Sequence, residues 1–171
     1  RRMYDISNAQ PEPGFLQHLI REEYTRETLG EVRTVLEERG TLRIQPVAHG
    51  LFAASPSHAE DSATGYQNAW VRDNIMVANS FRLRGEIPIA AACVNGLTRF
   101  FETQIPRFRE IIDDPAKVLK EDANRRPHIR FTAHSLKERP ESWPHAQNDA
   151  LGQALWFRCL LAEQGALPFT E

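Results

Sequence analysis

A helical repeat of apolar side chains between residues 89 and 104 is the feature that most limits how this chain folds. The stripe recurs at steps of three and four residues and ends in a glutamine; its members are Ile89, Ala92, Cys93, Gly96, Leu97, Phe100, Phe101 and Gln104. This spacing puts them on one face of a long helix, which must pack against other elements. Pro88 suits the first turn of that helix, and Pro106 is expected to end or kink it.

The remaining patterns predict an all-α fold class. No internal repeat and no alternation of strands with helices is visible. At most short strands are expected, near residues 42–55, and residues 120–142 are expected to form a long irregular connection. The other segments with helical periodicity are 15–24, 25–39, 70–83, 107–119 and 149–163.

The last of these helices, residues 149–163, is apolar around most of its circumference. A helix of this kind is expected to be buried on most sides, so it needs several neighbours. One expectation is that partner helices lie beyond Glu171, so that this chain self-associates through uncovered helices at 89–105 and 149–163. The alternative is a helix buried centrally in a small, complete domain.

Composition excludes several classes of partner. The net charge is −2, and basic residues alternate with acidic ones, so no nucleic acid is expected. No apolar segment approaches the length that spans a bilayer, so no membrane partner is expected. Cys93 and Cys159 lie in apolar helical patterns and are predicted to be buried thiols, which favours a reducing, cytoplasmic location. Because the chain starts at Arg1, a further expectation is that the natural N-terminus precedes it.

Two clusters combine aromatic, charged and amide side chains where a loop enters a helix. They are Tyr66–Asn74 and Trp143–Asp149. The structural interpretation is that Asp73 and Asp149 are helix caps or first-turn acids and that the tryptophans are core residues. The functional interpretation is sugar binding, because an indole ring stacks on the apolar face of a pyranose while charged and amide groups bind its hydroxyls. Both clusters would line one pocket if the two junctions lie at the same end of the fold.

No metal ion and no cofactor is expected. His128 and His134 are six residues apart and have no carboxylate companion in register, and His145 stands alone. Nucleophile elbows, phosphate-binding loops and dinucleotide fingerprints are absent from the sequence.

Four motifs, taken in order, resemble one known family. They are residues 50–55 (GLFAAS), 66–74 (YQNAWVRDN), 128–131 (HIRF) and 143–149 (WPHAQND). In this order they are similar to the glucoamylase-type glycoside hydrolases of family 15, and to the related domain at the start of the phosphorylase kinase regulatory α and β subunits. The resemblance spans residues 15–165 and implies part of an (α/α)6 helical barrel, an incomplete toroid. Residues 14–171 would be the N-terminal portion of one such domain, and residues 1–13 a flexible lead-in.

The resemblance also implies which residues bind substrate. Arg72 and Asp73 would bind hydroxyls of the non-reducing glucose, and Trp143 would stack near the scissile linkage. The full set of implied substrate-binding residues is Tyr66, Trp70, Arg72, Asp73, Arg130, Trp143, His145, Gln147 and Asp149.

Family members cleave α-glucosidic bonds with inversion, which requires a general acid and a general base. The resemblance places both beyond Glu171, so no catalytic residue is assigned here and the chain alone is expected to be inactive. Three features depart from the family pattern: the long approach at 56–65, Pro144 with His145 after Trp143, and the segment 99–140, which has no clear counterpart.

Three functions are therefore compatible with the sequence. The first is an inverting hydrolase whose partner is an α-glucan or α-glucoside substrate. The second is a non-catalytic, glucan-binding regulatory module like the phosphorylase kinase domain. The third is a helical interaction domain in which the same polar residues are structural.

Overall fold

The computed structural model describes residues 17–54, 68–122, 125–139 and 147–168. Contacts within the chain divide it into two compact units, residues 1–44 and 45–171. The predicted lead-in at residues 1–13 lies outside the described residues.

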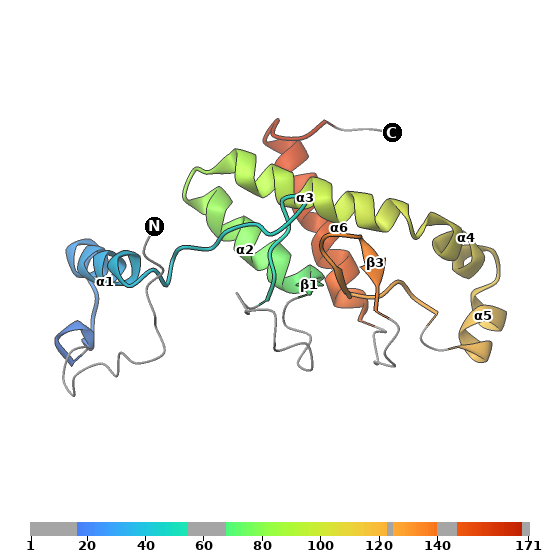
Figure 1. Ribbon diagram of the computed structural model, residues 1–171, viewed down its shortest axis with the longest axis horizontal. Helices are drawn as coiled ribbons and strands as arrows, with labels where there is room; N and C mark the ends of the chain where they lie inside the picture. The colour runs from blue at the N-terminus through green and yellow to red at the C-terminus, as the bar shows by residue number, and fades with distance from the viewer. Residues whose placement is uncertain (1–16, 55–67, 123–124, 140–146, 169–171) are drawn as a thin grey trace. The chain divides into compact units, whose positions relative to one another are not determined.

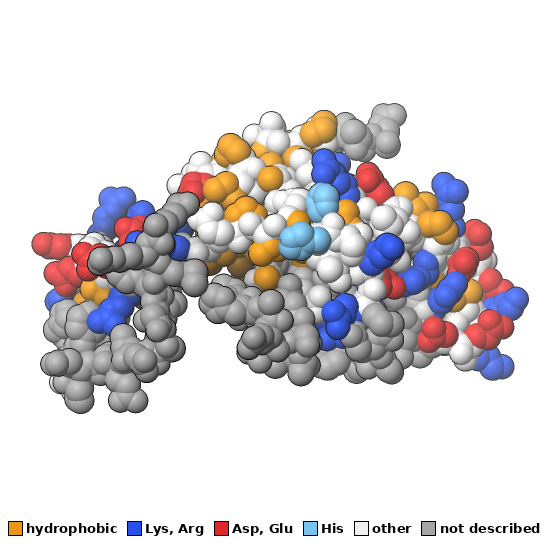
Figure 2. Space-filling view, viewed as in Figure 1, with side chains coloured by type: hydrophobic (Ala, Val, Ile, Leu, Met, Phe, Trp, Pro, Cys, Tyr) orange, Lys and Arg blue, Asp and Glu red, His pale blue; other side chains and the backbone are white. Residues whose placement is uncertain are grey.

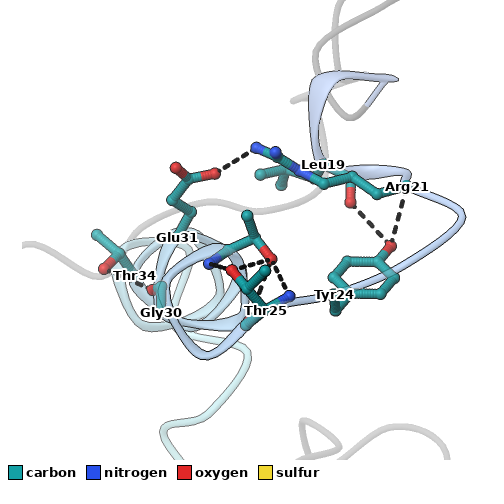
Figure 3. Close-up of polar contacts among 8 residues, drawn as sticks. Leu19, Arg21, Tyr24, Thr25, Gly30, Glu31 and Thr34 are labelled. Carbon is teal, nitrogen blue, oxygen red and sulfur yellow. Dashed lines mark hydrogen bonds and ion pairs between the residues drawn. The ribbon is translucent and has the colours of Figure 1, made fainter.

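The described part of the first unit contains a short 3-10 turn, η2 (Gln17–Leu19), and one helix, α1 (Arg26–Glu38). The predicted helix at 15–24 is wrong over its described part, because only residues 17–19 are helical. Figure 3 shows the reason: the Tyr24 hydroxyl donates to the Leu19 carbonyl at 2.9 Å and accepts from the Arg21 N–H at 3.3 Å, which holds a non-helical turn. Thr25 then starts α1 as an extended N-cap, in a reciprocal capping box with Thr28.

The second unit is built on three helices, α2 (Val71–Leu83), α3 (Ile87–Glu102) and α6 (Asn148–Glu163). Each of the three contacts the other two, and they lie across one another in the centre of Figure 1. Part of the apolar stripe predicted for residues 89–104 faces this core: its members Cys93, Gly96, Leu97 and Phe100 are buried. Ala92 of the stripe is exposed, and the core also takes in Ala90 and Val94 of α3, which the stripe did not include. The helical fold class predicted from the sequence is confirmed.

Two shorter helices follow α3. They are α4 (Ile105–Asp113) and α5 (Pro115–Glu121), and Asp114 separates them by capping Lys117 N–H at 3.1 Å. Charged side chains of both signs gather over these two helices in Figure 2. None of the described helices is both long and apolar enough to cross a membrane.

A small antiparallel sheet accompanies the helices in the described residues. Its strands, in the order β1-β2-β3, are β1 (Ala69–Trp70), β2 (Arg130–Thr132) and β3 (Lys137–Glu138). The expectation that strands are confined to residues 42–55 is therefore wrong, and that region has an isolated bridge between Ala48 and Leu51. The prediction of a wholly irregular 120–142 is also wrong. Strands of two or three residues are too short to show alternation, so only long-range pairing reveals them.

The turn around the Ala48–Leu51 bridge packs directly on the backbone of α3. Gly50 has φ +76°, and a Cβ there would lie 2.6 Å from the Ala92 carbonyl carbon and oxygen. A Cβ on Gly96 would lie 2.4 Å from the His49 carbonyl oxygen. Both positions require glycine because backbone meets backbone at this contact. The turn is thus fixed against the central helix.

The last helix, α6, is covered on one side. Its buried residues are Ala150, Phe157, Leu161 and Ala162, whereas Leu155 is 66% exposed and Trp156 is 52% exposed. The prediction that both cysteines are buried is correct for Cys93 and wrong for Cys159, which is exposed. The reason is that α6 packs on α2 and α3, while Cys159 lies on the face that these helices do not cover.

Candidate functional site

The starts of α2 and α6 are joined by one arginine. Arg72 Nη1 lies 3.1 Å from Asp149 Oδ2 and also donates a hydrogen bond to Gln147 Oε1. These partners are 75 and 77 positions away in the sequence. The structure therefore brings the described parts of the two polar clusters together.

Local structure explains why Arg72 is available for this contact. Trp70 is the extended N-cap of α2, with φ −112° and ψ 132°, and β1 runs directly into the helix. Val71 is fully buried beneath the junction, and its N–H donates to the Ile129 carbonyl at 2.9 Å. Arg72 follows immediately, and its half-buried side chain extends toward α6.

Trp70 and Arg130 form the second part of the site. They are register partners in the β1-β2 pairing, and the Arg130 guanidinium carbon lies 5.5 Å from the centre of the indole ring. Arg130 is only 7% exposed. A cation over an indole face is stabilised by roughly 0.5–2 kcal/mol, depending on desolvation. This arrangement occupies one face of the Trp70 ring, so a sugar would have to use its other face or its edge.

A half-buried carboxylate holds the segment that leads into β2. Glu138 Oε1 accepts the His128 N–H at 2.7 Å, and Arg107 Nη1 lies 2.7 and 2.9 Å from the two Glu138 oxygens. The sequence did not single out Arg107 or Glu138, since each looks like one charge among many in a polar stretch. Together they tie α4 and β3 to the strand that carries Arg130.

The two aspartates differ in their partners. Asp149 is in the first turn of α6 and pairs with Arg72, whereas Asp73, in the first turn of α2, is exposed and makes no hydrogen bond or ion pair with any other described residue. Neither is the N-cap, a position held by Trp70 and Gln147. Both carboxylates are favourably placed for the helix dipole.

Three predicted residues, Tyr66, Trp143 and His145, lie outside the described residues. The other six are Trp70, Arg72, Asp73, Arg130, Gln147 and Asp149, all at or beside the starts of α2 and α6 or on β2. Their role as sugar ligands stays a prediction. Among the residues that the structure describes, no three His, Cys, Asp or Glu side chains gather as metal ligands.

An apolar groove lies elsewhere in the second unit. It encloses about 240 Å³ and is lined mainly by α3 and α6 residues, including Leu97, Phe101, Leu151 and Leu155. None of the six predicted sugar-binding residues that the structure describes lines it. The groove and the polar site at the helix starts are therefore separate features.

Comparison with known proteins gives two informative matches. The family model for glycosyl hydrolases family 15 matches residues 35–169. A relative described as "Uncharacterized lipoprotein YgeQ", from Escherichia coli (strain K12), is 27% identical over 156 residues. That match covers 80% of this chain and 57% of the relative, so the chain spans little more than half of the relative's length. No solved structure gives a significant match.

The family match covers most of the second unit, including the starts of both α2 and α6. It agrees with the resemblance seen in the four ordered motifs and with the (α/α)6 fold class that the resemblance implied. This chain belongs to the glycosyl hydrolases of family 15.

Proposed function

We propose that this chain supplies the glucose-binding part of a hydrolase that cleaves α-glucosidic bonds with inversion. The observation that carries the proposal is the contact of Arg72 with Gln147 and Asp149, beside the Trp70–Arg130 pair. It gathers a guanidinium, a carboxylate, an amide and an indole ring from distant parts of the chain. Family membership supports the same reaction class.

The groups at this site suit the hydroxyl rim of a glucose unit. A carboxylate accepts hydrogen bonds from hydroxyls and a guanidinium donates to them, and both are charge-assisted and stronger than neutral pairs. Asp73 has no described partner, so its oxygens are available to a ligand. The Arg72–Asp149 pair has side chains 37% and 57% exposed, and such a pair stabilises by at most about 1 kcal/mol. Arg72 can therefore share its donors with a sugar at little cost.

Inversion needs two further carboxyl groups, about 6.5–9.5 Å apart, with the attacking water between one of them and the sugar. The proposal assigns neither role within this chain, since the resemblance places the acid and the base beyond Glu171. The residues here would bind the non-reducing glucose and orient its anomeric carbon. Positioning of this kind lowers the barrier by fixing reacting groups in a near-attack geometry.

A non-catalytic glucan-binding module is the second candidate function. It is favoured by the fact that four of the six predicted site residues with a described position, Trp70, Arg72, Arg130 and Gln147, carry side chains suited to binding rather than to proton transfer. The two functions share the same binding step and differ only in hydrolysis.

Titration calorimetry with maltose and maltotriose tests the binding step. In the full-length natural protein, Asp73→Asn is expected to weaken binding at least tenfold while the melting temperature stays within a few degrees, because Asp73 is exposed and unpaired among the described residues. Asp113→Asn, an exposed aspartate at the end of α4, is the matched control and should bind like the natural protein. Equal affinity in both variants, or no saturable binding at all, would refute the proposed site.

Hydrolysis of maltose, isomaltose, trehalose and maltotriose by the full-length natural protein then separates the two functions. Release of β-glucose from an α-linked substrate, observed by NMR before mutarotation, is expected for the inverting hydrolase. Saturable binding that needs Asp73, without hydrolysis of any of these sugars, would instead establish the binding module.

A further inference from the structure

One polar side chain at the start of α2 faces the core instead of the surface. Asn74 follows Arg72 and Asp73 in the sequence, yet it is 0% exposed. A buried amide must find hydrogen-bond partners inside the protein, because it has lost those that water would offer. The hydrogen-bond partners of the Asn74 amide therefore indicate its structural role.

The Asn74 amide uses both of its donors and both of its acceptor positions. Oδ1 accepts the Phe52 N–H at 2.8 Å and the Cys93 thiol at 3.5 Å. Nδ2 donates to the Phe52 carbonyl at 3.0 Å and to the Trp70 carbonyl at 2.9 Å. An asparagine has two N–H donors and two lone pairs on its oxygen, so this set exhausts its capacity.

These bonds connect the 47–52 turn, which packs on α3, to the candidate site. Phe52 is 2% exposed, stacks on Phe81 with ring centres 5.6 Å apart, and follows the turn that packs on α3 through Gly50. Trp70 is the N-cap of α2 and makes no side-chain capping bond. Asn74 is thus the side chain that joins the 47–52 turn to the residue from which α2 starts.

The geometry of the site depends on that junction. Trp70 packs beneath Arg130, and Arg72, two residues further on, reaches α6. A change in the direction of the chain at residues 70–72 would move the indole ring and the guanidinium in different directions. A displacement of about 1 Å is enough to disrupt a binding geometry built on several directed hydrogen bonds.

We infer that Asn74 is a positioning residue of the sugar site, which holds Trp70 and Arg72 in place without touching the ligand. This inference rests on the proposed function, because it takes glucose binding as the event that Asn74 supports. No other common side chain reproduces its bonds: aspartate lacks the two N–H donors, leucine lacks all polar groups, and glutamine is one methylene longer.

Two variants in the full-length natural protein separate positioning from simple stability. Asn74→Ser removes the side-chain hydrogen bonds to Phe52 and Trp70. Ile75→Ala truncates the adjacent side chain of α2, which is 1% exposed and lies in the same core. Both are measured at a low temperature at which each is folded. Asn74→Ser is expected to raise the Kd for maltotriose at least tenfold, and Ile75→Ala less than twofold. Equal changes in the two variants, or no change in Asn74→Ser, would overturn the inference.

Hydrogen exchange supplies a measurement that needs no sugar. Asn74→Ser should speed exchange at the hydrogen-bonded amides of Phe52 and Val71 at least tenfold, with the amides of residues 94–100 in α3 unchanged. Ile75→Ala should speed exchange throughout the core instead. If the natural protein binds no maltotriose, the proposed function fails, and exchange alone then decides whether Asn74 holds the junction. Uniform acceleration in Asn74→Ser would show that it does not.

A second substitution at the same position, Asn74→Asp, tests the inference if Asn74→Ser does not fold. Asn74→Asp keeps the size of the side chain, and in its neutral form it offers one O–H donor in place of two N–H donors. It should show the same local exchange pattern as Asn74→Ser to a smaller degree, and lower pH should partly restore maltotriose binding. An Asn74→Asp variant that matches the natural protein in both measurements would also overturn the inference.

Discussion

At the scale of single residues, Cys93 shows how burial fixes a chemical property. Its side chain is 0% exposed, and its single S–H is shared between the Asn74 carbonyl oxygen and Asn74 Oδ1, which lie 3.6 and 3.5 Å from the sulfur. Burial raises the pKa of this thiol from 9.0 to about 12, because the thiolate would lose its hydration. Cys159 on α6 is exposed and provides an internal comparison.

The raised pKa of Cys93 predicts a loss of stability in alkali. Below pH 9 the thiol is protonated in both the folded and the unfolded chain. Between pH 9 and about pH 12 only the unfolded chain loses this proton, so stability falls as pH rises through this window. Urea unfolding at pH 8 and pH 10.5 should show that Cys93→Ala removes on the order of 1–2 kcal/mol of the alkaline loss. Cys159→Ala should retain the full loss, and equal slopes in the two variants would contradict this account.

At the scale of elements, the distance between a helix and its neighbouring backbone determines whether a glycine of that helix can be replaced by alanine. Glycine in a helix interior normally costs roughly 0.5–1 kcal/mol relative to alanine. Gly96 of α3 and Gly152 of α6 are both in helices, but a Cβ at Gly96 would lie 2.4 Å from the His49 carbonyl oxygen, while a Cβ at Gly152 would meet nothing within 4 Å. The two positions should therefore respond in opposite directions.

Chemical denaturation tests this difference. Gly96→Ala is expected to lower the free energy of unfolding by about 1–3 kcal/mol, because the 47–52 turn must move away from α3. Gly152→Ala should raise it by roughly 0.5–1 kcal/mol. Stabilisation by both substitutions would mean that the turn does not pack on α3 as described. A stable Gly96→Ala variant would also mean that Asn74 bonds to a turn that is not fixed against α3.

The elements also show what local patterns predict. The helices at 70–83, 89–105 and 149–163 were predicted within a few residues, because each carries an apolar stripe or a helix boundary in its own sequence. The helix at 15–24 was wrong because Tyr24 and Leu19 form a side-chain to backbone bond that no periodicity reports. Strands β1 and β2 were missed since Trp70 pairs with Arg130, which is 60 positions further along the chain.

At the scale of the whole second unit, apolar surface remains exposed on α6. Leu155 and Trp156 are 66% and 52% exposed, and the groove of about 240 Å³ between α3 and α6 is open to solvent. Exposed apolar patches of this kind bind hydrophobic dyes and promote association. The 171-residue chain is therefore expected to bind the dye ANS in its folded state and to associate at increasing concentration.

Dye fluorescence and sedimentation velocity check this expectation. The double substitution Leu155→Gln with Trp156→Ser should reduce both dye binding and association without unfolding the chain. Ile112→Gln changes a residue of α4 that is 75% exposed and does not line the groove, and it should alter neither. A monomeric chain without dye binding would show that this surface is covered in solution.

The sequence by itself determined the helical class, the main helices of the second unit and, through four ordered motifs, the family. These properties follow from local periodicity and from residue order, which the linear chain already contains. Only the tertiary structure decided that Arg72 meets Gln147 and Asp149, that Arg130 lies over Trp70, and that Cys159 is exposed while Cys93 is buried. Each of these depends on which helix faces pack together, and that choice is made by contacts between residues far apart in the chain.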